Sequence, residues 1–365
     1  MSLATRGKAH PAMRWLGALA FLAISPWAQA YLPGGIAVHE DPNLHIIEQL
    51  ANPPDGHVDY AQVQTAIERT ANPKFDAKAF NATLDHWASL VRARVPKDAP
   101  PTAVMTALGE VIYTPGPWND HHPFSYDLDD PFGKVYENKL VSTYLRTRKG
   151  NCVSMPTLLI ILGQKLGLTM TLSQAPEHEF ARLQDVNGRW FNIEATSPGS
   201  PPDSKYINEM HITQQQIESG IYLRTTTLHE TVAGMLDPLE AVYAHQRTPG
   251  DLLGLATLVV KLDPKNAGGY VNEANAFFLE LQHRYLDRHL TPANLRPEQR
   301  ADFNALFESN TRILKRVEAM GWAPPTPAGD KEYLDRIQRY KAAHGGCPCR
   351  GVGRDWQLGQ LHLLY

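Results

Sequence analysis

The sequence predicts an α+β protein in which helices come first and last and a small antiparallel sheet lies between them. Apolar residues recur at helical spacing through residues 42–112, and again from about residue 236 to 340. Between these regions, residues 168–195 read as three short strands. Helices segregated from a short run of strands are typical of the α+β class and not of repeated βαβ units.

Length, composition and charge limit the organisation and the partners. With 365 residues, 43% hydrophobic and 20% charged, the chain can bury at least one full core. We expect an N-terminal helical region at 31–112, a core at 113–230, a helical domain at 231–345 and a tail at 346–365. The formal net charge of −3 disfavours nucleic acid and anionic membrane surfaces, and favours a protein or peptide-like substrate.

Residues 1–30 have the pattern of a secretory signal peptide. Basic residues, an apolar run and small residues before a cleavage site follow one another at 6–14, 15–24 and 28–30. A retained membrane anchor needs about 20 apolar residues, and this run is roughly half as long. We therefore expect cleavage after Ala30, no membrane association afterwards, and a periplasmic or secreted location.

The N-terminal helical region leads into a long loop. Helices are expected at 42–50, 60–70, 76–95 and 102–112. Residues 113–133 are rich in Pro, Gly, Asp and aromatic residues, which predicts an irregular loop that borders the functional site. His121 and His122 lie in it, but adjacent histidines do not face one metal together and no acidic partner stands at helical spacing. We expect no metal site and no cofactor.

A change of period marks the sheet. Helices are expected at 135–148 and at 153–165, the second buried on all sides and ended by Gly167. Strand-like segments follow at 168–174, 178–185 and 189–195.

The C-terminal helical region contains one segment, residues 256–274, that resembles the junction between two tetratricopeptide helices. Such repeats need about three copies to bury a continuous core, so a single unit must pack on another part of the protein. An ordinary helical domain is the alternative interpretation. In either case these helices offer a surface for a protein partner.

Cys152 lies far in the sequence from the other two cysteines. An exported protein keeps few free thiols unless they have a function, so a lone cysteine is a candidate functional residue. Cys347 and Cys349 could close a strained disulfide, pair between chains or have no role. A metal site that adds His344 would lack a fourth ligand.

Cys152, His178 and Glu194 form the candidate catalytic triad. A thiol at a helix N-terminus faces unpaired amides and the positive end of the helix dipole, which favour the reactive thiolate. His178 begins a predicted strand and could take and return the thiol proton, while Glu194 near the end of the next strand could hold the imidazole. The helix amides could also stabilise an oxyanion. The alternative is an inert, buried cysteine and an exposed strand histidine.

The length of the loop between the last two strands decides whether this triad can form. A two-residue loop at 187–188 would place His178 and Glu194 on opposite faces of the sheet. A three-residue loop at 186–188 pairs Asp185 with Arg189 and puts Glu194 diagonally across from His178, about 7 Å away at the backbone. We predict the three-residue loop. Asn192 has the same parity and is the alternative residue to orient the histidine.

These stretches resemble the transglutaminase-like superfamily, whose core has a cysteine at a helix start, a histidine on one strand and an acid on the next. The matching segments are 148–152, 178–180 and 188–196, and Glu194 stands where Asp is usual. The segments 138–140 and 166–168 resemble a bacterial subgroup with a helical start and a tetratricopeptide-like end.

The resemblance implies a papain-like α+β fold and acyl transfer through a thioester: cross-linking, deamidation, proteolysis or amide hydrolysis. It also implies an alternative, because some members have lost catalysis and serve as protein-protein interaction modules. Pro156 lies in the first turns of the expected catalytic helix, where it removes a backbone hydrogen-bond donor and makes the start of the helix irregular.

Overall fold

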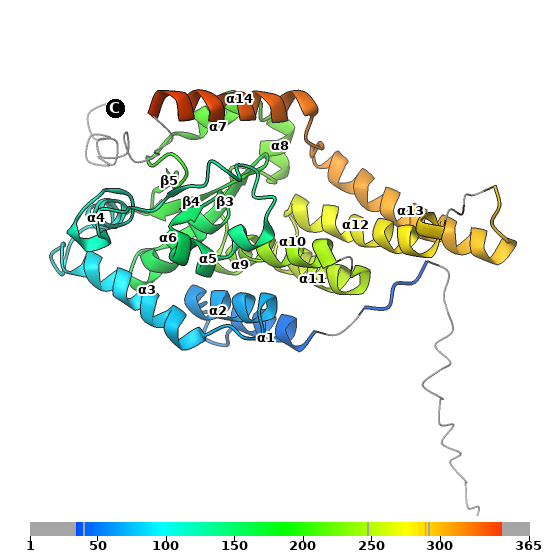
Figure 1. Ribbon diagram of the computed structural model, residues 1–365, viewed down its shortest axis with the longest axis horizontal. Coiled ribbons are helices and arrows are strands. Elements are labelled where there is room, and N and C mark those ends of the chain that lie inside the picture. The colour runs from blue at the N-terminus through cyan, green and yellow to red at the C-terminus, as the bar shows by residue number, and fades with distance from the viewer. Residues whose placement is uncertain (1–33, 39–40, 247, 289, 291–292, 345–365) are drawn as a thin grey trace, which may run out of the picture. The chain divides into compact units, whose positions relative to one another are not determined.

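A computed structural model describes residues 34–38, 41–246, 248–288, 290 and 293–344, all within one compact unit (Figure 1). The predicted signal peptide, Cys347 and Cys349 lie outside these residues, so those predictions stand as they were made. Within the described segments, no helix is both long enough and apolar enough to span a bilayer.

The N-terminal helices lie close to where the sequence predicts them. They are α1 (Pro42–Ala51), α2 (Tyr60–Ala71), α3 (Ala77–Arg92) and α4 (Pro101–Tyr113). Aspartates cap the first three, because the side chains of Asp41, Asp59 and Asp76 accept hydrogen bonds from backbone amides of the first turn. The fourth begins with a proline at its first position, where the missing N–H costs no hydrogen bond.

The segment after α4 is irregular, as predicted, and short elements lie within it and after it. Those within 135–148 fall in the range of a predicted helix, and the others were not predicted. The short elements are η1 (Pro117–Asn119), β1 (Ser125–Tyr126), η2 (Tyr136–Lys139), α5 (Val141–Thr147) and β2 (Lys149–Gly150). Strands β1 and β2 pair in parallel. This pairing holds the loop at 113–133 beside Gly150, the residue before Asn151 and Cys152.

The single helix predicted at 135–148 is wrong. Leu140 is extended, with ψ of 135°, and separates η2 from α5. The buried Glu68 of α2 explains the break, because its carboxylate accepts from Ser142 N at 2.9 Å and from Ser142 Oγ at 2.6 Å. A cap supplied by a side chain 74 residues away leaves no local pattern in the sequence.

The central helix and sheet follow the prediction. Helix α6 (Ser154–Lys165) is buried along most of its length, and Gly167 ends it with φ of +82°. Strands β3 (Met170–Ala175), β4 (His178–Gln184) and β5 (Trp190–Ile193) form an antiparallel sheet in the order β3-β4-β5.

The three-residue loop between β4 and β5 is confirmed. Asp185 N donates to Arg189 O at 2.9 Å, Gln184 pairs with Trp190, and Gly188 takes the left-handed conformation with φ of +79°. Side chains of residues 178, 180, 182, 192 and 194 therefore point to one face of the sheet, and those of 179, 181 and 183 to the other.

The chain after the sheet is helical, and the predicted helical patterning from 236 to 340 is confirmed. The elements are α7 (Asp203–Glu209), α8 (Gln214–Ser219), α9 (Leu228–Met235), α10 (Asp237–Gln246), α11 (Pro249–Leu262), α12 (Ala267–Arg284), η3 (Leu286–Arg288), α13 (Pro297–Ala319) and α14 (Pro327–His344). Helix α12 packs on both α11 and α13.

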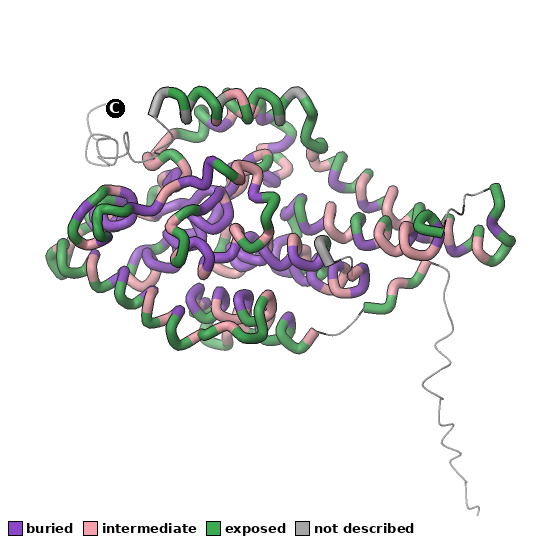
Figure 2. The backbone as a smooth tube through the Cα atoms, in the orientation of Figure 1, coloured by how far each residue is buried: buried purple, intermediate pink, exposed green. Residues whose placement is uncertain are grey.

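The main hydrophobic core crosses the predicted domain limits. One cluster of buried side chains runs from Leu44 in α1 to Ala276 in α12 and includes most of α6. Figure 2 shows the same distribution, with buried backbone concentrated in the sheet and α6 and exposed backbone along α14. The α+β class is confirmed, and the boundaries at 112 and 230 stay predictions.

Candidate active site

Cys152 lies in the turn that opens α6. Asn151 caps this turn: its side-chain oxygen accepts from Val153 N and Ser154 N, each at 3.1 Å, and Met155 N donates to Asn151 O. Gly150 is needed just before it, because an added Cβ would lie 2.6 Å from a ring carbon of Tyr144. The local sequence thus holds the thiol at the start of the buried helix.

The hydrogen bonds around Cys152 show which of the predicted helix amides are free to bind an oxyanion. Two of the first amides of the helix, those of Val153 and Ser154, are already bound to Asn151. The Cys152 N–H has no acceptor within the described part of the chain, so it is the helix amide best able to bind a developing negative charge. Because Pro156 has no backbone N–H, the helical hydrogen bond to Cys152 O is missing from this turn.

His178 and Glu194 meet on one face of the sheet, as the three-residue loop requires. His178 Nε2 lies 2.7 Å from Glu194 Oε2, and their side chains are 13% and 5% exposed. The side chain of Cys152 also hydrogen bonds with His178. Cys152 itself is half-buried, and its Sγ also lies 3.9 Å from Glu177 O.

The electrostatics of the pair favour two opposite charges. Burial alone would lower the pKa of His178, but the charge of Glu194 and the hydrogen bonds that His178 makes with Cys152 and Glu194 outweigh it, and the pKa rises from 6.5 to about 10. Burial alone would raise the pKa of Glu194, but His178 and the Thr196 donors lower it from 4.5 to about 2. At neutral pH the histidine is protonated and the glutamate is ionised.

Two residues that the sequence did not indicate hold the Glu194 carboxylate. Thr196 donates to Oε1 from its backbone N at 2.9 Å and from its hydroxyl at 2.7 Å. Tyr206 of α7 donates to Oε2 at 3.0 Å, is buried, and stacks on Phe180 with ring centroids 4.4 Å apart. No pattern connects Tyr206 with the strands, because a loop rich in Pro and Ser separates them.

Asn192 does not contact His178, although its parity is right. Its amide nitrogen donates to Asp203 Oδ1 at 2.7 Å and to Pro201 O at 3.0 Å. Arg182 of β4 binds the same aspartate oxygen at 2.8 Å. Asn192 and Arg182 therefore anchor the start of α7, the helix that carries Tyr206.

The loop at 113–133 borders the cysteine. Tyr126 is buried, and besides its burial the charge of Cys152 raises the Tyr126 pKa well above its ordinary value. Its hydroxyl lies 2.5 Å from the hydroxyl of Tyr333 in α14 and donates to Pro131 O at 2.6 Å. The same loop is tied to the start of the catalytic turn by Asp127 N, which donates to Gly150 O at 2.7 Å.

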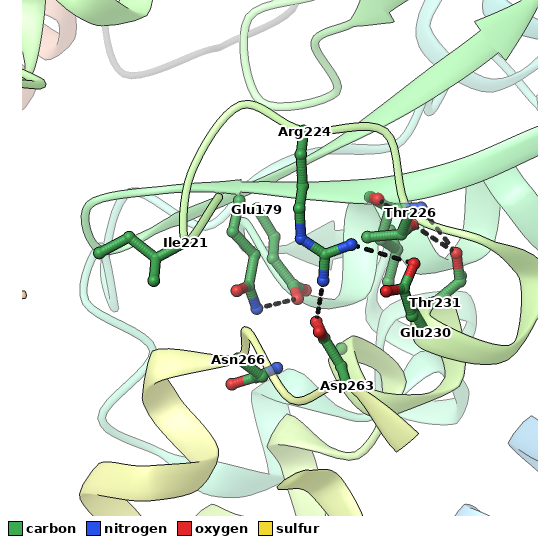
Figure 3. A pocket seen from close by; sticks show the side chains of 11 residues that line it. Glu179, Ile221, Arg224, Thr226, Glu230, Thr231, Asp263 and Asn266 are labelled. Carbon is green, nitrogen blue, oxygen red and sulfur yellow. Dashed lines mark hydrogen bonds and ion pairs between the residues drawn. The ribbon is translucent and has the colours of Figure 1, made fainter. Parts of the chain in front are cut away.

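Glu179 follows His178 in β4 but faces the other side of the sheet. There it lines a polar pocket with Arg224, Asp263 and other residues of the C-terminal half (Figure 3). Gln174 donates to its Oε1 at 3.2 Å, while its buried Oε2 has no partner among the described residues. Burial and the charge of Asp237 raise the pKa of Glu179 from 4.5 to about 8.

The structure thus brings together the three residues of the predicted triad: a half-buried cysteine at a helix start and a buried histidine and glutamate on neighbouring strands of an α+β core. Residues 78–236 match the family model of the transglutaminase-like superfamily. This part of the chain belongs to that superfamily, as the resemblance implied. The match includes α3 and α4, which precede the core predicted to begin at residue 113.

A search of known proteins adds a distant relative. The chain is 21% identical over 209 residues to a "UPF0162 protein" of Buchnera aphidicola subsp. Baizongia pistaciae (strain Bp), which covers 55% of this chain and 72% of the relative. No solved structure matches the chain significantly.

Proposed function

We propose that the protein is an exported, cysteine-dependent enzyme that acts on amide or peptide-like bonds through a thioester acyl-enzyme. The observation that carries this proposal is the 2.7 Å contact between His178 Nε2 and Glu194 Oε2, made while the same imidazole hydrogen bonds with the side chain of Cys152. A structural cysteine would need neither an oriented imidazole nor a buried, fully hydrogen-bonded acid.

The proposed reaction assigns a role to each residue. The Cys152 thiolate attacks the carbonyl carbon, and the Cys152 N–H binds the oxyanion. His178 then gives its proton to the leaving amine as the carbon–nitrogen bond breaks and the thioester remains. Water or an amine attacks the thioester, His178 takes the proton of that nucleophile, and the thiolate is released. Glu194 keeps the imidazole oriented and stabilises its charge.

The competing interpretation is a catalytically silent interaction module. It would be favoured by a fully buried Cys152 or by a Glu194 on the face away from His178, and neither is observed. The half-buried thiol and the shared face of the sheet support the enzyme instead.

An activated ester tests the acylation step without knowledge of the natural substrate. With p-nitrophenyl acetate we expect a burst of p-nitrophenol and an acetyl group on Cys152, both absent from Cys152→Ala and strongly slowed in His178→Ala. Intact-protein and peptide mass spectrometry locate the acetyl group. Equal acetylation rates in the wild type and His178→Ala would contradict the proposal, because the thiol would then react without its base.

A further inference from the structure

The Asn138–Lys139–Leu140 motif has no part in the triad, yet its backbone is bound to residues on both sides of Cys152. Asn138 O accepts from Asn151 Nδ2 at 3.2 Å and from Ser154 Oγ at 3.3 Å. Asn151 immediately precedes the cysteine and Ser154 follows it by two positions. The motif therefore lies against the turn that carries Cys152. Lys139, the residue after Asn138, extends its side chain from this position.

The Lys139 side chain runs past this turn to α10. A Cβ added at Gly133 would lie 3.5 Å from Lys139 Cε and 2.9 Å from Asn151 Nδ2, so the lysine and the capping asparagine approach the same point. Lys139 Nζ then donates to Asp237 Oδ1 at 2.7 Å. The lysine side chain is 19% exposed and that of Asp237 36%. The lysine end of this ion pair is thus largely shielded from solvent, and charges act over longer distances there than at the surface.

Carboxylates from two elements surround the lysine, and their protonation decides the local charge. Asp237 and Glu240 lie on α10, and Glu179 lies on β4. Burial and the charge of Asp237 raise the pKa of Glu179 and of Glu240 to about 8, so both are neutral at neutral pH. Glu240 Oε2 accepts from Asn272 at 2.7 Å, and its buried Oε1 has no partner among the described residues. Of these carboxylates, Asp237 alone balances Lys139 in this pH range.

The charge of Cys152 is one of the causes that raise the pKa of Lys139. Burial lowers the Lys139 pKa, but Asp237, Cys152 and Glu240 outweigh it and the pKa rises to about 12. Such an interaction is reciprocal, so an ammonium that gains stability from a thiolate stabilises the thiolate equally. Other titratable residues near Cys152 are His178, Tyr126 and Glu177, whose backbone oxygen lies 3.9 Å from Sγ. Tyr126 stays neutral because its pKa is raised.

We propose that Lys139 is a second cation supporting the Cys152 thiolate, beside His178, and that the negative charge of Asp237 limits this support. This inference rests on the proposed function, because it concerns the reactivity of the same thiol. It assigns a role to a motif that sequence resemblance singled out without explaining.

The test compares the pH dependence of Cys152 alkylation by iodoacetamide in two variants of one ion pair. Lys139→Met removes a positive charge and should raise the pH of half-maximal rate by about half a unit to one unit. Asp237→Asn removes the balancing negative charge and should lower that pH, since burial, the largest cause of the raised pKa of Glu179 and Glu240, still keeps both carboxyls protonated in the acidic range. General structural damage would not shift the two variants in opposite directions.

Matched controls separate charge from packing. Lys165→Met breaks an ion pair of the same length, 2.7 Å to Asp85, at the far end of α6, and should leave the profile unchanged. Lys139→Arg keeps the charge and should retain most of the wild-type profile. If Lys139→Met does not fold, the double variant Lys139→Met/Asp237→Asn leaves no unpaired buried charge, and should show a smaller upward shift.

A Lys139→Met or double-variant profile identical to that of Lys165→Met would overturn the inference. The failure is distinguishable from failure of the proposed function. In the first case wild-type Cys152 still reacts at low pH and loses this reactivity in His178→Ala. In the second case wild-type Cys152 does not react until the protein unfolds.

Discussion

Glu194 and Glu179 are two buried glutamates that flank the same histidine from opposite faces of the sheet, yet their protonation differs. Glu194 receives four hydrogen bonds, including one from His178, and its pKa falls to about 2. Glu179 receives one, from Gln174, and its pKa rises to about 8. Burial is nearly the same, 4% and 6% exposure. The partners of a carboxylate, and not its depth, decide whether it carries charge.

The largest expected effect comes from neutralising the ionised member. Glu194→Gln removes the anion that raises the His178 pKa, and burial then lowers that pKa towards or below 6.5. We expect a loss on the order of 10³-fold in the rate of acetylation by p-nitrophenyl acetate. An NMR pH titration of the His178 ring measures the pKa directly. A His178 pKa that stayed near 10 in Glu194→Gln would break the comparison at its strongest point.

The opposite result is expected for the neutral member. Ionising Glu179 disfavours the folded state, because its folded pKa lies above its unfolded value, so this destabilisation grows as pH rises from 4.5 to about 8. Glu179→Gln should therefore raise the free energy of unfolding by roughly 4 kcal/mol at pH 8 and much less at pH 5. Urea unfolding at both pH values measures it. Equal gains at the two pH values would show that Glu179 is not protonated in the folded protein.

For Glu194 the pH dependence has the other sign. Its folded pKa is depressed, so its contribution to stability is complete above pH 4.5 and is lost as pH falls towards about 2. In Glu194→Gln this acidic loss should be smaller than in the wild type. Urea unfolding between pH 5 and 2 compares the two proteins, and parallel curves would contradict the assignment of Glu194 as an ionised, paired group.

A smaller effect is expected from Tyr206→Phe, which keeps the ring on Phe180 and removes only the hydroxyl bound to Glu194 Oε2. One lost hydrogen bond to a charged group corresponds to about 1.5–3 kcal/mol, of which the Thr196 donors retain part by holding the other oxygen. We expect about a tenfold slower acetylation of Cys152. Tyr222→Phe, a change at a buried tyrosine that does not bind Glu194, serves as the control and should react at the wild-type rate.

The smallest effect concerns the loop that assigns each glutamate to its face. Gly188 has φ of +79°, a conformation that alanine adopts with strain, so Gly188→Ala should lower the free energy of unfolding by about 1 kcal/mol. The Cys152 alkylation profile should stay unchanged, because the register is also held by the ladder between β4 and β5. A changed profile would mean that the loop, and not the ladder, positions Glu194.

The sequence was sufficient for features that depend on local pattern. Apolar spacing and Gly167 located the helices, and the parity of a three-residue loop placed Glu194 on the face of His178. The sequence missed features made by contacts between distant segments: the break at Leu140 set by Glu68, the support of Glu194 by Tyr206, and the pairing of Lys139 with Asp237. Asn192 shows the limit best, since its face was predicted and its partner was not.

The most direct test of an activated Cys152 is the pH dependence of its alkylation by iodoacetamide, comparing the wild type with His178→Ala. We predict a half-maximal rate at a pH well below about 8.5, the ordinary value for a cysteine thiol, and loss of that low-pH reactivity in the variant. A Cys152 that stays unreactive until the protein unfolds, or that reacts equally in both proteins, would contradict the ion pair on which the proposed enzyme depends.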